Sequence, residues 1–308
     1  MLPNIYIPSY KRAGRNKTLN YFLAVGVPPE DITVVVDDQT PDLAEYRAEA
    51  DETGTHLLVF DMERAIAEYD FVTLPNVARR TAGLARNQIW KSAKKNKKGI
   101  FVVLDDDTSG FEIKANTGDY LRMAKLEDIE RAFSEVVEFM EKRRIGLFGL
   151  PQTGDFIGGQ TRGNKVMMNK VMNTTFINPL LVQAGERGLL DTDTSQFLAV
   201  GVNGLFTGST AWGLTLKQTP SAVSKGGLTE VYKDARLFVK SMMCPLQCPS
   251  AVSANYQPKN GGRIHHTIQS RYVNPKILRS MDDRTNIAWD TYPEDTPITL
   301  ARRIADAD

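Results

Sequence analysis

The chain has few cysteines and lacks any long apolar run. Two cysteines in 308 residues cannot build a disulfide framework and are typical of a reducing compartment. No segment approaches the roughly 20 apolar residues that a membrane-spanning helix requires. The first residues predict a strand rather than a signal peptide. These absences predict a cytoplasmic protein that does not enter a membrane.

The chain also lacks a strong net charge. Its formal net charge is +1 at pH 7, so attraction to an acidic partner must come from local clusters of basic residues. Cys244 and Cys248 have a C-x3-C spacing that can contribute to a zinc site. A structural zinc site needs four ligands, however, and we do not expect one here.

The most informative stretch is residues 101–111. Four apolar residues, 101–104, predict a short buried strand, and Asp105, Asp106 and Asp107 follow directly. Unpaired buried carboxylates are too costly for a core, so we expect these three in a loop at the carboxyl end of the strand. Ligands bind at that edge in open α/β sheets, and three adjacent negative charges favour a cation. The alternative is an ordinary turn, because Asp-Thr-Ser-Gly is also a good turn sequence.

Strand and helix patterns alternate through residues 1–150. We expect strands at 5–7, 32–36, 56–60 and 101–104, and helices at 18–25, 41–53, 81–98 and 126–140. This order predicts an α/β fold in which a mostly parallel sheet is flanked by helices on both faces.

After residue 150 the pattern is weaker. Residues 152–163 are rich in Gly, Gln and Thr and predict a loop near the site or an exposed connection. We expect strands at 172–177 and 197–206, the second interrupted by Gly201 and Gly204. Residues 225–239 predict a glycine turn into a helix capped by Thr229. Helix signals fade from Pro245 onward, which predicts an irregular C-terminal extension.

Carboxylates at a strand end that faces a basic loop are typical of a binding site for a nucleoside diphosphate and its metal ion. Mg²⁺ or Mn²⁺ takes oxygen ligands from one or two carboxylates, from phosphates and from water. We expect Asp107 as a direct ligand, with Asp105 sharing the metal or binding ribose. Asp37 can accept a hydrogen bond from a nucleobase or cap the next helix. Three cations after the first strand can bind phosphate or form an exposed loop: Lys11, Arg12 and Arg15.

Two further pairs can complete such a site. His265 and His266 follow two glycines and can bind the metal, or one of them has a structural role. Glu230 and Asp234 lie one turn apart on an expected helix. Either can deprotonate an acceptor hydroxyl, and the alternative is a solvated helix face.

Three motifs resemble those of GT-A-fold glycosyltransferases. The segment Ile-Pro-Ser-Tyr-Lys-Arg at 7–12 resembles their opening, Ala-Arg-Asn at 85–87 resembles their helix before the metal strand, and Val-Leu-Asp-Asp-Asp at 103–107 resembles their D-x-D strand. More narrowly, the opening Pro-Ser-Tyr-Lys-Arg-x-x-Arg is similar to the TET-associated glycosyltransferases of phages, proposed to decorate oxidised or hydroxymethylated DNA bases. The general resemblance covers residues 4–240 and falters between 152 and 201.

The resemblance implies a hexosyltransferase-type enzyme with a Rossmann-like sheet, a nucleoside diphosphate sugar, expected to be a UDP-sugar, and Mn²⁺ or Mg²⁺. It implies a metal at Asp105 and Asp107, often completed by a C-terminal histidine, here His265 or His266. It also implies a later acidic residue on the acceptor side, which we assign to Glu230 or Asp234. The residues expected around the donor are Pro8, Tyr10, Arg12, Arg15, Asp37, Arg86, Asp105 and Asp106.

We expect a donor and acceptor domain at 1–240 and an extension at 241–308 that packs on the active-site side. A phage protein of this kind would work in the host cytoplasm. If the acceptor is a DNA base, the base must be flipped or single-stranded, and cations must hold the backbone. The candidates are Lys259, Arg263, Arg271, Lys276, Arg279 and Arg284, with Asp282 and Asp283 weakening the patch.

Two alternative functions differ from this hypothesis in testable ways. A sugar-1-phosphate nucleotidyltransferase would need a glycine-rich phosphate loop in the first turn, and residues 8–12 are not one. A non-catalytic nucleic-acid-binding protein would bind DNA in a salt-sensitive manner that is indifferent to metal and to Asp107.

Overall fold

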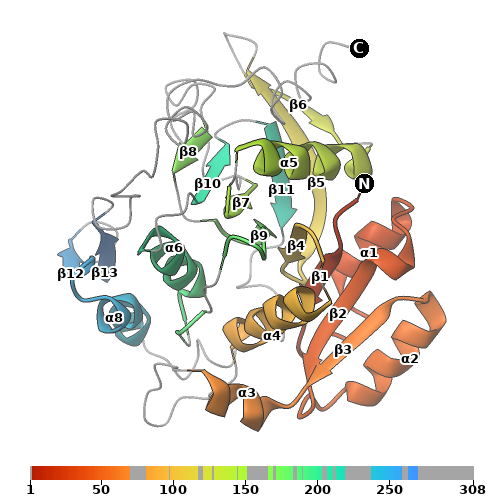
Figure 1. Cartoon of the computed structure of the whole chain (residues 1–308), viewed down its shortest axis with the longest axis horizontal. Helices are drawn as coiled ribbons and strands as arrows, with labels where there is room; N and C mark the ends of the chain where they lie inside the picture. The colour runs from red at the N-terminus through yellow and green to blue at the C-terminus, as the bar shows by residue number, and fades with distance from the viewer. Residues whose placement is uncertain are drawn as a thin grey trace.

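The computed structural model describes most of the chain as an α/β structure (Figure 1). The described residues are 2–69, 81–96, 98–116, 121–126, 128–143, 145–150, 166–168, 171–182, 186–188, 190–202, 207–210, 213–218, 237–258 and 263–269. An eight-stranded sheet with the strand order β3-β2-β1-β4-β9-β7-β10-β8 forms the centre. A three-stranded sheet, β11-β5-β6, and a hairpin, β12-β13, accompany it.

The first third of the chain builds the parallel half of the central sheet. Its elements are β1 (Ile5–Pro8), α1 (Lys17–Ala24), the 3-10 turn η1 (Pro29–Asp31), β2 (Ile32–Asp37), α2 (Leu43–Thr53), β3 (His56–Phe60), α3 (Met62–Glu68), α4 (Ala82–Lys95) and β4 (Phe101–Leu104). Strand β1 lies between β2 and β4, and these pairs are parallel, as is the pair β2–β3. The strands and helices expected for this region are confirmed.

The later elements add antiparallel pairs. They are β5 (Thr108–Asn116), β6 (Leu121–Lys125), α5 (Ile129–Arg143), β7 (Leu147–Gly149), β8 (Val166–Met168), β9 (Thr174–Ile177), α6 (Thr192–Val202), β10 (Thr207–Thr210), β11 (Gly213–Gln218), α8 (Leu237–Gln247), β12 (Val252–Gln257) and β13 (Arg263–Ile268). Strand β9 runs antiparallel between β4 and β7, and β8 runs antiparallel to β10, whereas β7 and β10 are parallel. The sheet is therefore mixed, with parallel pairs in the majority.

Strands β1, β2 and β4 are buried on both faces, which is why they read as largely continuous apolar runs. In β1, Ile5 and Ile7 belong to one core cluster and Tyr6 to another, as the two-residue period of a strand requires. Helices α1 and α5 pack on the first face, and α3 and α4 pack on the second. The prediction of helices on both faces is confirmed, and the carboxyl ends of the parallel strands remain at one edge.

The segment expected to form a strand at 197–206 is a helix over its described part, so that expectation was wrong. Helix α6 runs from Thr192 to Val202. It is apolar on more than one side: Phe197 and Leu198 pack against α8 and β12, whereas Val200 belongs to the core of the central sheet. A helix buried on two sides lacks a clear 3.6-residue period, and its apolar run resembles that of a buried strand.

Over residues 237–258 and 263–269, the C-terminal part forms one helix and two strands. Helix α8 continues to Gln247 with Pro245 inside it, and the histidine segment pairs with β12 as an antiparallel strand. Helix α8, β12 and β13 lie together beside α6 (Figure 1). The predictions for 152–163 and 225–236 fall outside the described residues. None of the helices in the described part of the chain is long and apolar enough to cross a membrane.

Replacing Phe133 of α5 should test the first core cluster. Its fully buried ring makes edge contacts with Phe111 and Phe176 at centroid distances of 5.4 and 5.0 Å. Phe133→Ala should lower the free energy of unfolding by about 3–5 kcal/mol, measured by urea titration. Leu180→Ala, at a side chain that is 85% exposed, should change it by less than about 0.5 kcal/mol. Equal effects of the two changes would contradict this description of the core.

Candidate active site

Three of the predicted site segments meet at one edge of the central sheet. Strand β1 ends at Pro8, β2 ends at Asp37, and the aspartate triplet forms a turn directly after β4. Because β1 is paired in parallel with both β2 and β4, their carboxyl ends lie side by side. The triplet therefore lies where the sequence predicted, at the edge at which α/β sheets bind ligands.

Asp106, the middle carboxylate, anchors the loop that follows β1. It accepts a hydrogen bond of 2.6 Å from the Ser9 hydroxyl and forms an ion pair with the Arg12 guanidinium. The Tyr46 hydroxyl lies 2.7 Å from the Ser9 hydroxyl and accepts a hydrogen bond of 3.0 Å from the Arg12 amide. Burial raises the pKa of Asp106 to about 7, although Arg12 and Ser9 favour its charged form. The loop after β1 is thus fixed to the end of β4 by the contacts of Ser9 and Arg12 with Asp106.

Asp105, the first carboxylate, is held by an arginine from α4. Arg86 donates to Asp105 Oδ1 at 2.6 Å through Nη2, and its Nη1 lies 3.0 Å from Thr192 Oγ1 and 3.3 Å from Glu186 Oε1. Burial alone would lower the pKa of Arg86, but the Glu186 and Asp105 carboxylates outweigh this effect and raise it. Arg86 therefore joins the end of β4 to the first turn of α6.

Glu186 is fixed to α4 by its backbone as well as by its side chain. The Asn87 amide group donates to the Glu186 carbonyl at 2.8 Å and accepts from the Glu186 amide at 2.7 Å. A Cβ at Gly83 would lie 3.0 Å from Glu186 Oε2 and 3.1 Å from Thr192 Cγ2, so a residue without a side chain permits this close approach. Neither Glu186 nor Thr192 was expected at the site, because no periodic pattern or motif in the sequence marks either of them.

Glu186 is only 1% exposed, and its Oε2 has no hydrogen-bond partner among the described residues. Burial raises the pKa of Glu186, and Arg86 and Thr192 oppose the shift only in part. Arg86 thus contacts both Asp105 and Glu186, whereas Arg12 contacts Asp106. Because burial raises the pKa of Asp106 and Glu186, these two carboxyl groups do not count as full negative charges near pH 7.

The other expected donor residues are spread along the same edge. Pro8 is buried at the end of β1, and Tyr10 is half-buried with the Lys11 ammonium 5.0 Å from its ring centroid. Arg15 is exposed and donates to the Lys11 carbonyl at 2.7 Å. Asp37 is buried and accepts from the Gln39 amide at 3.0 Å, so it caps the turn after β2. Their contacts with a nucleotide stay predictions.

The expected histidine ligands lie on β13, where His266 Nδ1 is 3.4 Å from Asp191 Oδ2. Over the described ranges, the group of His, Cys, Asp and Glu side chains close enough to share a metal ion is Asp191, Cys244 and His266. The structure does not group Asp105 and Asp107 with a histidine there. Glu230 and Asp234 fall outside the described residues, so their expected role in catalysis stays a prediction.

The pKa of Glu186 predicts how stability depends on pH. The folded protein holds the proton of the Glu186 carboxyl group more tightly than the unfolded chain does. The protonated group therefore contributes its full share to the free energy of unfolding below the ordinary pKa of 4.5, and this share is lost as the pH rises through the raised pKa. The wild-type protein should therefore lose unfolding free energy relative to Glu186→Gln above about pH 4.5, measured by urea titration at several pH values. Glu52→Gln, at an exposed site of α2, is the control. Parallel curves for wild type and Glu186→Gln would refute the assignment.

Comparison with solved structures returned matches to sugar-transferring enzymes. Glucosyl-3-phosphoglycerate synthase from Mycobacterium tuberculosis, in a complex with Mn²⁺, UDP-glucose and glycerol 3-phosphate, is 13% identical with a TM-score of 0.44, and the match covers 88% of each chain. A mannosyltransferase from Pyrobaculum calidifontis, in a complex with GDP-Man and Mn²⁺, is 14% identical with a TM-score of 0.45, covering 72% of this chain and 59% of that one. Comparison with curated proteins found no match.

A family model gives the assignment. The model described as TET-Associated Glycosyltransferase matches residues 3–210, which is well over half of the chain. The matched range contains the loop after β1, Asp37, Arg86 and the aspartate triplet, and it also includes Glu186. The family expected from the opening motif and the D-x-D strand is therefore confirmed, and the chain belongs to the TET-associated glycosyltransferases.

Proposed function

We propose that this glycosyltransferase takes its sugar from a nucleoside diphosphate sugar, expected to be a UDP-sugar, bound with Mn²⁺ or Mg²⁺ at the end of β4. The observation that carries the proposal is the aspartate triplet at the edge where β1, β2 and β4 end, in a chain of a glycosyltransferase family. Family membership also argues against the two alternatives, a nucleotidyltransferase and a non-catalytic binding protein.

The donor set at this edge fits a hard divalent cation. Mg²⁺ and Mn²⁺ prefer oxygen ligands and are commonly held by one or two carboxylates together with phosphates and water. Asp107 is the proposed direct ligand, and Asp105 shares the metal or binds the ribose. When bound, such a cation neutralises the charge that develops on the leaving diphosphate.

The protein's own residues position these groups before the donor arrives. Arg12 and Ser9 hold Asp106, and Arg86 holds Asp105, so the turn after β4 is fixed at both of its first two residues. Fixed charges need no reorganisation when the glycosidic bond breaks, which is the main source of electrostatic catalysis. Lys11 and Arg15, on the same loop, are proposed to bind the diphosphate, and Asp37 the nucleobase.

The acceptor is proposed to be the hydroxyl of a hydroxymethylated base in phage DNA. The name of the matched family, TET-associated, supports this acceptor class. Enzymes that modify a base act on single strands or take the base out of the duplex stack, so this base must be flipped out or single-stranded. Glu230 or Asp234 is proposed to accept the proton of the attacking hydroxyl, and His265 can still complete the donor metal's shell.

Donor binding should depend on Asp107. In the presence of Mn²⁺, the matching nucleoside diphosphate sugar should raise the unfolding free energy by about 2.7 kcal/mol at a hundredfold excess over its dissociation constant, measured by thermal unfolding. Asp107→Ala should remove most of this stabilisation, because it removes a metal ligand, and chelator should have the same effect on the wild type. Asp51→Ala, at an exposed aspartate of α2, should behave as wild type. Full metal-dependent stabilisation of Asp107→Ala would refute the proposed metal site.

Sugar transfer should depend on the hydroxymethyl group of the acceptor. With a labelled donor, label should enter single-stranded DNA that contains 5-hydroxymethylcytosine and should be absent from the same sequence with cytosine. The reason is that only the modified base carries the accepting hydroxyl. Asp107→Ala should abolish the incorporation. Donor-dependent labelling of a small polyol, with none in hydroxymethylated DNA, would retain the transferase and refute the DNA acceptor.

A further inference from the structure

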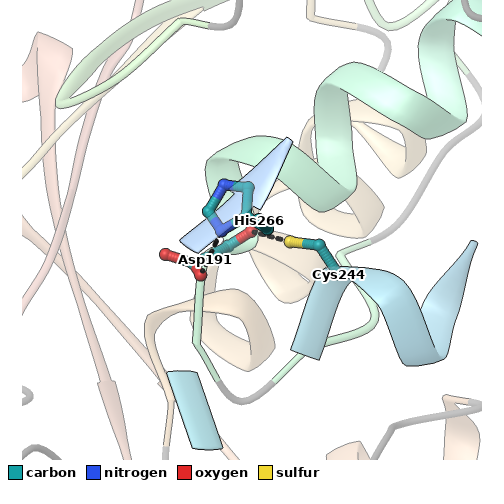
Figure 2. A group of neighbouring side chains, drawn as sticks. All are labelled: Asp191, Cys244 and His266. Atoms are coloured by element: carbon teal, nitrogen blue, oxygen red, sulfur yellow. Dashed lines mark hydrogen bonds and ion pairs between the residues drawn. The ribbon is translucent and has the colours of Figure 1, made fainter. Parts of the chain in front are cut away.

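Three side chains from distant parts of the chain converge beside α6 (Figure 2). Asp191 directly precedes α6, Cys244 lies in α8, and His266 lies in β13. Their candidate ligand atoms all lie within 4.8 Å of one another. His266 Nδ1 is 3.4 Å from Asp191 Oδ2, and Cys244 Sγ is 3.9 Å from the Asp191 carbonyl oxygen. The cluster therefore combines a carboxylate, a thiol and an imidazole.

The spacing suits a tetrahedral ion. Bonds of about 2.0–2.2 Å from zinc to nitrogen or oxygen place two ligands of a tetrahedron about 3.4 Å apart. The His266–Asp191 distance has this value, so these two atoms need no rearrangement. A thiolate bonds at about 2.3 Å and lies slightly farther from its neighbours, within the range found for Cys244.

The cluster is shielded from water. Cys244 is fully buried, and the side chains of His266 and Asp191 are 10% and 7% exposed. The Asp191 carbonyl accepts the amides of Thr194 and Ser195, which fixes the residue at the start of α6. A catalytic thiol would have to be reached by its substrate, so a fully buried Cys244 argues against a cysteine nucleophile.

We propose that Asp191, Cys244 and His266 bind a Zn²⁺ ion that links their three segments and is separate from the metal of the sugar donor. Zinc accepts thiolate, imidazole and carboxylate together, whereas Mg²⁺ and Mn²⁺ favour oxygen. A thiolate and a carboxylate balance the charge of the ion, and Cys244 gives up its proton when the ion binds. With three protein ligands, the fourth position of the tetrahedron is taken by a water molecule, so this centre differs from the four-ligand site considered for Cys244 and Cys248. His266 then serves this centre and not the donor metal.

The position of the proposed zinc centre suggests that the ion stabilises the packing of α6, α8 and the β12–β13 hairpin. Helices α6 and α8 and strand β12 meet around a small apolar cluster: Phe197, Leu198, Cys244, Ala251 and Val252. A metal bound by Asp191, Cys244 and His266 would join the turn before α6 to α8 and to β13, the strand that pairs with β12. It would add to the apolar contacts of this cluster, as structural metals do in small cores. Asp191 is followed by Thr192, which Arg86 contacts, so the same turn also borders the donor edge.

Cobalt substitution tests the ligand set directly. The purified protein, stripped with chelator and given Co²⁺, should show the near-ultraviolet absorption of a thiolate–cobalt bond. Cys244→Ser should lose this band, whereas Cys248→Ser, four residues further along, should keep it. A wild-type protein without the band would overturn the proposal, as would a band that depends on Cys248 and not on Cys244.

A second measurement leaves the three metal-binding residues unmutated, in case Cys244→Ser does not fold. The wild-type protein should retain about one zinc per chain after purification, and stripping should lower its melting temperature by several degrees. Zn²⁺ should restore the melting temperature, and Mn²⁺ should not. Asp107→Ala should respond to Zn²⁺ as the wild type does, which separates this centre from the donor metal. An unchanged melting temperature on stripping and reloading, or full rescue by Mn²⁺, would overturn the proposal.

Discussion

The candidate site depends on the pairing of consecutive carboxylates with two arginines at the end of β4. A buried carboxylate without a partner is too costly to keep, and breaking a buried pair is strongly destabilising. Asp106 is paired with Arg12 from the loop after β1, and Asp105 with Arg86 from α4. These two contacts bring segments separated by up to about ninety residues to one turn. They hold the loop, the helix and the strand end in the arrangement that a phosphate-bearing ligand would meet.

Arg86 also connects the end of β4 to the start of α6. This side chain also reaches Glu186 and Thr192, and Thr192 directly follows Asp191 of the proposed zinc centre. The first turn of α6 thus borders two sites of different chemistry. Oxygen ligands for a hard cation are proposed at one, and oxygen, nitrogen and sulfur ligands for zinc at the other. This difference in ligands would allow each site to select its own metal.

Local patterns were sufficient for the parallel half of the sheet. Its strands are mostly apolar runs, the helices expected between them are present, and the Thr81 side chain caps α4 by accepting the Gly83 amide. Residues 197–202 are as apolar as a buried strand but form part of helix α6. The helix was not recognised because it is buried on two sides, so its apolar residues show no 3.6-residue period. The pairing that makes β13 a strand comes from β12, so the histidine segment alone carried no such signal.

The sequence by itself determined the α/β class, the family resemblance and the position of the aspartate triplet at a strand end. Charge cannot enter a core unpaired, and parallel strands end at one edge, so these conclusions needed no tertiary contacts. Only the tertiary structure showed that Arg12 and Arg86 hold two of the carboxylates and that Glu186 lies beside them. It also grouped His266 with Asp191 and Cys244, a pairing that spacing along the chain could not reveal. Contacts between residues 19 to 106 positions apart are set by packing, which no local pattern records.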